Sequence, residues 1–290
     1  MEDRPATGEL DLRRVDARPV HGSVAEDAWV ARGRYAAFGV SWAIQADDIS
    51  AYHLLLDRLP PGAAPTSSKN NVRSYAFRTI PPATPGDDVS FLLLADGRPL
   101  VRSSEPSDVA DAFEENLNWL VAERSQRRVF VHAGVVGWRD RAIIIPGGPR
   151  SGKSTLVRAL VACGATYYSD DYAVLDGGTV QPYRSRLPEC NGEYAGLSCL
   201  LDELRGVPQA GPLPVGIVVF APYQAGASFK PKLLSRGKSL LGLFKQAVAA
   251  QRRPEHVLRV LDAVTRKCNA LEGVRGDAHA VATYLLDRLV

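Results

Sequence analysis

The chain has 290 residues, a net charge of +3 and 23% charged residues. So small a charge, without a basic tract, gives no reason to expect a nucleic-acid partner, and no apolar run is long enough for a membrane span. The first residues are charged and lack an apolar segment, and the four cysteines lie far apart, so we expect no signal peptide, no disulfide framework and a cytoplasmic location.

Residues 1–104 predict a small α+β domain that opens with a polar, irregular arm. Alternating apolar residues and turn signals mark its strands, and Asp96-Gly97 is a strong hairpin signal. The expected elements are a strand over Tyr35–Ile44, a helix over Ile49–Leu59, a strand over Val72–Ile80, and a hairpin of Ser90–Leu94 with Pro99–Arg102.

Residues 105–128 predict a connecting helix, because apolar side chains recur at helical spacing from Phe113 to Val121. Residues 129–290 predict a second domain of strands and helices, with a long irregular segment from Arg184 to Pro214. Its expected strands are Val129–Val136, the run that ends at Ile145, Thr166–Ser169 continued by Tyr172–Leu175, Val180–Tyr183, Val215–Phe220 and an edge strand over Lys230–Leu234. Five helices are expected: one that begins at Lys153, one over about Leu197–Leu204, one over Leu240–Ala250, one that begins at Pro254 and one that begins at Gly276-Asp277. The helix that begins at Pro254 is expected to have an apolar face that reaches Cys268 and Leu271.

A glycine-rich loop lies between a buried strand and a helix, and from Gly147 to Ser154 it fits G-x-x-x-x-G-K-[ST]. This pattern is typical of a phosphate-binding loop, whose backbone N–H groups and helix N-terminus hold phosphate oxygens. Lys153 is expected to reach the β- and γ-phosphates, and the Ser154 hydroxyl to bind Mg²⁺. The predicted ATP-binding residues are Gly147, Gly148, Pro149, Arg150, Ser151, Gly152, Lys153, Ser154 and Thr155.

Two adjacent carboxylates, Asp170-Asp171, follow a short aromatic strand after the loop helix. A carboxylate beside the γ-phosphate can accept the proton of a substrate hydroxyl, while its neighbour binds the metal. The alternative interpretation is a pair of turn carboxylates or a plain Mg²⁺ ligand. His132 is a third candidate, and its alternative is a hydrogen-bonded core histidine.

Together these features resemble the catalytic core of bacterial HPr kinase/phosphorylase, a P-loop kinase family. That family has a strand histidine, a P-loop and a double aspartate at the same mutual separations as His132, Lys153 and Asp171, over about residues 129–183. The resemblance implies an α/β fold related to phosphoenolpyruvate carboxykinase, with the P-loop in a mixed sheet. It also implies ATP- and Mg²⁺-dependent phosphorylation of a serine hydroxyl and a homo-oligomer.

Carried over to this chain, the family's roles make Asp171 the proton acceptor, Asp170 a neighbour near the metal, Lys153 the phosphate clamp and His132 a residue that helps to hold the site. The family's glycine-rich segment after the double aspartate is missing, so its acidic metal ligand and later arginine have no aligned counterpart. The candidates are Glu189 or Glu193 for the acid, and Arg236, Arg252 and Arg253 for the arginine, with Arg184 and Arg186 as further anion ligands.

The leading hypothesis is therefore an ATP-dependent kinase that phosphorylates a serine-type hydroxyl of a protein, a peptide or a small molecule, resembling divergent HPr-kinase relatives that modify peptide natural products. A second hypothesis is an ATP-binding sensor without phosphotransfer. The adjacent carboxylates favour the kinase, because a binder needs only one. A plain NTPase or transport motor is disfavoured by the missing Walker B glutamate, and a carboxykinase by the missing metal-binding set.

Overall fold

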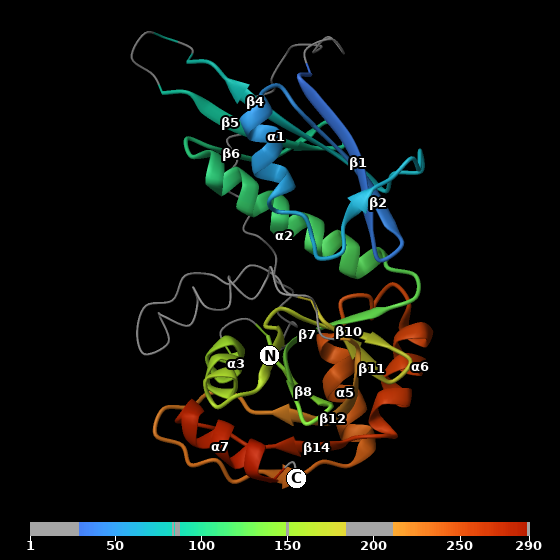
Figure 1. The fold of residues 1–290 in the computed structure, drawn as a ribbon, viewed down its shortest axis with the longest axis vertical. Helices are drawn as coiled ribbons and strands as arrows, with labels where there is room; N and C mark the ends of the chain where they lie inside the picture. Colours follow the sequence, from blue (N-terminus) through green and yellow to red (C-terminus); the bar gives the residue numbers. More distant parts are fainter. Residues whose placement is uncertain (1–28, 83, 85–87, 149–150, 184–210, 289–290) are drawn as a thin grey trace, which may run out of the picture. The chain divides into compact units, whose positions relative to one another are not determined.

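In a computed structural model, the structure describes residues 29–82, 84, 88–148, 151–183 and 211–288. These residues form a mixed α/β protein that contains two sheets and six helices. The chain divides into two compact units, one up to Val121 and the other from Ala122, and each is described by itself (Figure 1). Among the described helices, none is both long and apolar enough to cross a membrane.

The first unit is a six-stranded sheet with two helices. Its strand order is β3-β1-β2-β4-β5-β6, antiparallel except for the parallel pair β2–β4. On β4, the Tyr75 ring packs edge-on against Phe113 of α2 at 5.0 Å, and its hydroxyl donates to the Asn116 side chain at 2.7 Å. The elements are β1 (Ala31–Ala37), β2 (Val40–Ala46), α1 (Ile49–Leu56), β3 (Ala64–Pro65), β4 (Arg73–Ile80), β5 (Ser90–Ala95), β6 (Arg98–Ser103) and α2 (Pro106–Arg124).

The second unit is built on an eight-stranded mixed sheet of order β11-β10-β7-β8-β12-β14-β13, with β9 paired to β7. Strands β8, β12 and β14 are parallel to one another, whereas β7 is antiparallel to β8. The strands are β7 (Val129–Trp138), β8 (Arg141–Pro146), β9 (Thr166–Ser169), β10 (Tyr172–Asp176), β11 (Thr179–Gln181), β12 (Leu213–Phe220), β13 (Lys232–Leu233) and β14 (Asn269–Glu272).

Helices cover both faces of this sheet and bury two separate hydrophobic clusters. One cluster joins alternate residues of the central strands to α5 (Arg236–Gln246) and α6 (Pro254–Thr265). The other joins the opposite residues of the strands to α3 (Lys153–Ala162) and α7 (Ala278–Arg288). The three layers follow from strands such as β8, whose isoleucines are all buried because both of its faces are covered (Figure 1).

Three of the expected elements are wrong. The run Tyr35–Ile44 is a hairpin rather than one strand, because Phe38 (φ 52°) and Gly39 (φ 78°) turn the chain between β1 and β2. The stretch after Ser169 does not continue β9: β10 begins at Tyr172 and pairs with another part of β7. The helix that opens at Pro254 ends at Thr265, and Leu271 lies in β14, parallel to β12. The short helix expected near Leu197–Leu204 lies outside the described residues.

Candidate active site

The phosphate-binding loop predicted from the sequence connects the central strand β8 to α3. Its start is tied to the neighbouring strand, because the Gly147 N–H donates to the His132 carbonyl at 3.2 Å. Its end is Gly152, which precedes α3 with a φ of 84°. Such a φ is strained for any residue with a Cβ, so the glycine permits the sharp entry into the helix.

The described part of the loop fits an anion. The first turn of α3 has no side-chain cap, which leaves backbone N–H groups and the positive helix end for a ligand. The Ser151 hydroxyl is buried without a hydrogen-bond partner among the described residues, and a Cβ on Gly147 would lie 2.5 Å from it. The Lys153 ammonium donates to the Gly148 carbonyl at 3.0 Å. Pro149 and Arg150, also predicted to bind ATP, lie outside the described residues.

The double aspartate sits in a tight turn between β9 and β10, at the edge of the same loop. The buried Ser169 hydroxyl accepts the N–H groups of Asp171 and Tyr172 at 3.2 and 3.1 Å, and the Ala133 N–H of β7 donates to the Asp171 carbonyl at 3.1 Å. This turn points the two carboxylates into different surroundings: Asp170 is only 3% exposed, whereas Asp171 is exposed.

Asp170 is held from both sides. The Tyr167 hydroxyl donates to it at 3.2 Å, and the Ser154 side chain also forms a hydrogen bond with it. Burial, reinforced by the charge of Asp171, raises the pKa of Asp170 to about 6, against the opposing effect of these hydrogen bonds and of the Arg158 charge. A buried carboxylate of raised pKa beside the P-loop serine is a group whose ionised form a cation would stabilise.

The donor set fits Mg²⁺ bound together with a phosphate ligand. In the described part of the chain, no group of three or more His, Cys, Asp or Glu side chains gathers as a metal site. Mg²⁺ at nucleotide sites needs only one or two protein ligands, because phosphate oxygens and waters complete the octahedron. Ser154 and Asp170, joined by their hydrogen bond, can supply these ligands. Glu189 and Glu193, the other acidic candidates, lie outside the described residues.

Charge interactions connect the four residues predicted to be catalytic: Lys153 and Asp171 each interact with the other three, His132 and Asp170 included. Burial lowers the pKa of Lys153, and the charges of Asp171 and Asp170 oppose that shift. Burial and the charge of Lys153 lower the pKa of His132, and Asp171 opposes this shift, so the ring favours its neutral form. The His132 ring lies 4.9 Å from that of Tyr172, its partner across the β7–β10 pair.

Among the described residues, an arginine outside the predicted candidates reaches the loop. Arg275, which follows β14, is 1% exposed, and its guanidinium donates to the Gly152 carbonyl at 2.5 Å. By contrast, Arg236 is paired with Asp262. The other candidates are also placed elsewhere or not described: Arg253 donates to the Ser125 and Gln126 carbonyls, Arg252 is exposed, and Arg184 and Arg186 lie outside the described residues.

Sequence reasoning also missed the residues beneath the aspartates. Arg158 lies on α3 one turn after Ser154, is 3% exposed and acts on Asp170 through its charge. An arginine at an inward position of an amphipathic helix was the available signal, because a buried charge needs a partner of opposite sign. Tyr167 and Ser169, which hold the acidic turn, carried no comparable signal in the sequence.

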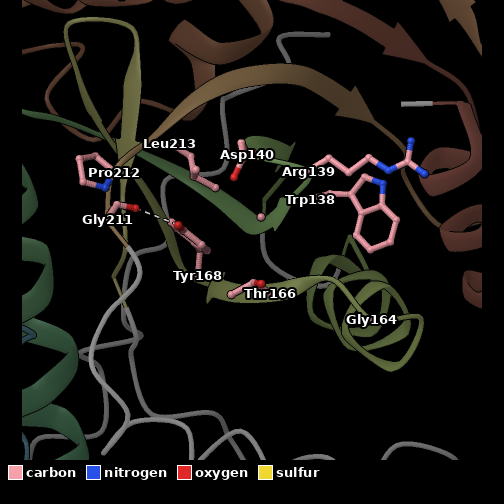
Figure 2. Close-up of a pocket in the computed structure, with 10 residues that line it drawn as sticks. Trp138, Arg139, Asp140, Gly164, Thr166, Tyr168, Gly211, Pro212 and Leu213 are labelled. Atoms are coloured by element: carbon pink, nitrogen blue, oxygen red, sulfur yellow. Dashed lines mark hydrogen bonds between the residues drawn. The ribbon is translucent and has the colours of Figure 1, made fainter. Parts of the chain in front are cut away.

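A pocket of about 490 Å³ lies elsewhere in the second unit. It is lined by the β7–β8 turn, including Arg139 and Asp140, and by Tyr168, whose hydroxyl donates to the Gly211 carbonyl at 2.8 Å (Figure 2). The turn precedes β8 and the phosphate-binding loop follows it, so the two sites lie at opposite ends of that strand. The pocket is therefore not part of the candidate active site.

No protein-family model and no curated protein matches the chain. Among solved structures, the HPr(Ser) kinase/phosphatase from Coxiella burnetii matches with a TM-score of 0.27 and 12% sequence identity, over 55% of this chain and 93% of that chain. The similarity is distant and assigns neither a fold family nor an activity. What the site can do therefore follows from the contacts of its own residues.

Proposed function

We propose that the chain is an ATP- and Mg²⁺-dependent kinase that transfers the γ-phosphate to a serine-type hydroxyl of a protein, a peptide or a small molecule. The observation that carries the proposal is the division of labour between the two aspartates. Asp170 is buried and hydrogen-bonded to the P-loop serine, Ser154, whereas Asp171 is exposed and acts on Lys153. A site that only binds a nucleotide has no use for the second, outward carboxylate.

Each residue then has one task in the transfer. Mg²⁺, when bound at Ser154 and Asp170, neutralises phosphate charge. Lys153 moves from the Gly148 carbonyl to the phosphates, and the backbone N–H groups at the start of α3 fix their position. His132, whose pKa is lowered, stays neutral and adds no positive charge that would hold Asp171 away from the acceptor.

The chemical step requires one proton to be removed. The Asp171 carboxylate accepts the proton of the acceptor hydroxyl as its oxygen bonds to the γ-phosphorus, and the bond between that phosphorus and the β–γ bridging oxygen breaks to release ADP. An exposed carboxylate suits this role, because a macromolecular acceptor must reach it from solvent.

The test is transfer from γ-labelled ATP with Mg²⁺ to a panel of HPr, free serine and serine-ending peptides. Asp171→Asn keeps the size and hydrogen-bonding outline of the side chain but cannot take a proton at neutral pH. We expect it to lower the transfer rate by about 10²- to 10⁴-fold while ATP binding persists. Lys153→Ala should weaken ATP binding itself, and Asp140→Asn, in the exposed β7–β8 turn, is the matched control.

The outcomes separate the hypotheses. Transfer that survives Asp171→Asn unchanged would refute the role of Asp171. Lys153-dependent ATP binding without transfer to any acceptor would favour the sensor. ATP binding that is absent, or indifferent to Lys153→Ala, would refute the nucleotide site altogether.

A further inference from the structure

Three loops converge at the end of the sheet where the P-loop opens. Strands β8, β12 and β14 are parallel neighbours (Figure 1), so the segments that follow them leave the sheet at the same edge, where open α/β sheets bind ligands. The segment after β12 is tied to the P-loop, because the Tyr223 N–H donates to the Ser151 carbonyl at 3.3 Å. It is also tied to the segment after β14, because the Gln224 N–H donates to the Arg275 carbonyl at 2.8 Å.

Arg275 connects these segments through hydrogen bonds of its backbone and its side chain. Its N–H donates to the Pro222 carbonyl at 3.0 Å, and its buried guanidinium donates to the Gly152 carbonyl. A Cβ on Gly152 would lie 2.4 Å from an Arg275 guanidinium nitrogen and 3.3 Å from the Tyr223 Cβ. Tyr223 is therefore packed directly against the turn that begins α3, in a position set by backbone hydrogen bonds.

The Tyr223 ring nevertheless stays open to solvent. Its residue is 57% exposed, although the loop that carries it is locked on both sides. The Arg275 guanidinium carbon lies 5.7 Å from the ring centroid, so one region of the ring is in contact with a cation. A large exposed aromatic ring on a fixed backbone, beside a phosphate-binding loop, is what a stacking platform for a nucleobase requires.

The residues on the two sides of the P-loop differ in chemistry, and this difference determines the orientation in which a nucleotide would bind. On the β7 side of β8 lie His132, Asp170 and Asp171, the groups to which the phosphate to be transferred must point. On the β12 side lie Tyr223 and Arg275, a ring and a guanidinium. Because the nucleoside and the γ-phosphate lie at opposite ends of the triphosphate, the base belongs on the side away from the aspartates.

We propose that Tyr223 stacks against the base of the nucleotide and that Arg275 acts as a positioning residue that holds both the ring and the Gly152 turn. This inference rests on the proposed function, because it assigns the nucleoside end of the same ligand. Aromatic stacking accepts any base, since every base has a π-face. Tyr223 therefore adds affinity for a nucleoside without choosing among bases.

The test compares ATP with inorganic tripolyphosphate, which has the phosphates but no base, by calorimetry on the full chain with Mg²⁺. Tyr223→Ala should weaken ATP binding about tenfold, within the range found for loss of one stacked base, and leave tripolyphosphate binding unchanged. Tyr223→Phe, which keeps the ring, should restore most of the lost ATP affinity. Leu233→Ala, a truncation of a side chain that is 73% exposed on β13, should change neither ligand.

Different results would contradict the stacking proposal and the kinase proposal on which it rests. ATP binding that depends on Lys153 but is the same in Tyr223→Ala as in the wild type would overturn the stacking role and leave the kinase proposal standing. Equal losses of ATP and tripolyphosphate in Tyr223→Ala would also overturn it, because they would show that Tyr223 only supports the loop. If the wild type bound neither ligand, both proposals would be wrong.

Discussion

The Asp170 carboxylate occupies a place where its ionised form is costly. It is buried beside another acid, and its pKa is raised to about 6 from the ordinary value of 3.8 for an aspartate. Between these two pH values the folded state holds a proton that the unfolded chain releases. Stability contributed by this group is therefore lost as the pH rises through the interval. At about 1.4 kcal/mol per pH unit the loss is at most about 3 kcal/mol.

Asp170→Asn removes that charge without changing the size of the side chain. We expect the variant to be more stable than the wild type at pH 7 by about 1–3 kcal/mol, with the difference shrinking toward zero near pH 4, and to lose phosphate transfer. Urea unfolding of both proteins without ligand across this range measures the difference. His132 also makes stability depend on pH: because its pKa is lowered, its contribution to stability is lost as the pH falls. This contribution is the same in both proteins, so it cancels from the difference between them.

Asp140→Asn, at an exposed turn, controls for the loss of any carboxylate. A difference between wild type and Asp170→Asn that stays constant with pH would show that Asp170 has the same pKa in the folded and the unfolded chain, and would contradict the raised pKa.

Gly152 combines two constraints that can be separated. Its φ of 84° disfavours any other residue, and a Cβ there would collide with buried Arg275. Gly226 has a similar φ of 72° but nothing within 4 Å of its Cβ position. Gly226→Ala should cost about 1–2 kcal/mol through the backbone alone, and Gly152→Ala about 1–3 kcal/mol more through the collision. Urea unfolding measures both costs, and equal costs would contradict the close contact with Arg275.

At the level of elements, α6 packs with α5 on one face of the second sheet and buries part of that face. Leu261 is fully buried among the strands and α5, whereas Leu258 on the same helix is 38% exposed. Leu261→Ala should therefore destabilise the chain by about 2–5 kcal/mol. Leu258→Ala, with the same change in volume, should cost less than about 1 kcal/mol. Thermal unfolding of the pair checks this, and similar losses would mean that α6 is not anchored through Leu261.

Elements with a local signal could be predicted from the sequence. Asp96-Gly97 forms the β5–β6 turn, with both residues at positive φ, and the apolar run of β7 and the buried isoleucines of β8 are strands. The β1–β2 turn was missed because Phe38, an apolar residue inside an apolar run, occupies a left-handed position that usually takes Gly or Asn.

The strand β14 was missed because its apolar residues continue the periodicity of α6. Leu271 fits the helical face by spacing, so only pairing with β12 reveals a strand. That error hid Arg275, whose contact with Gly152 spans 123 residues of sequence. The P-loop and the double aspartate were visible as local patterns, whereas residues that contact the loop from distant segments, such as Arg275 and Tyr223, depend on long-range packing that no local pattern encodes.

On the scale of the whole molecule, the candidate site is confined to one of the two compact units. Every residue placed at the site lies after Ala122, whereas the unit that ends at Val121 has its own sheet and its own buried aromatic residues. A ligand stabilises only the part of a protein whose opening destroys its site. The site's location therefore makes a prediction about which unit a nucleotide protects.

ATP with Mg²⁺, at about a hundred times its dissociation constant, should raise the free energy of global opening of the second unit by about 2.7 kcal/mol. Hydrogen exchange measured by mass spectrometry should show this as added protection in the slowest amides of β7, β8 and β12, and no change in those of β2, β4 and β5. Lys153→Ala should abolish the added protection. Equal protection of both sheets would mean that the two units open together, so that the first sheet contributes to the stability of the nucleotide site although none of its residues belongs to it.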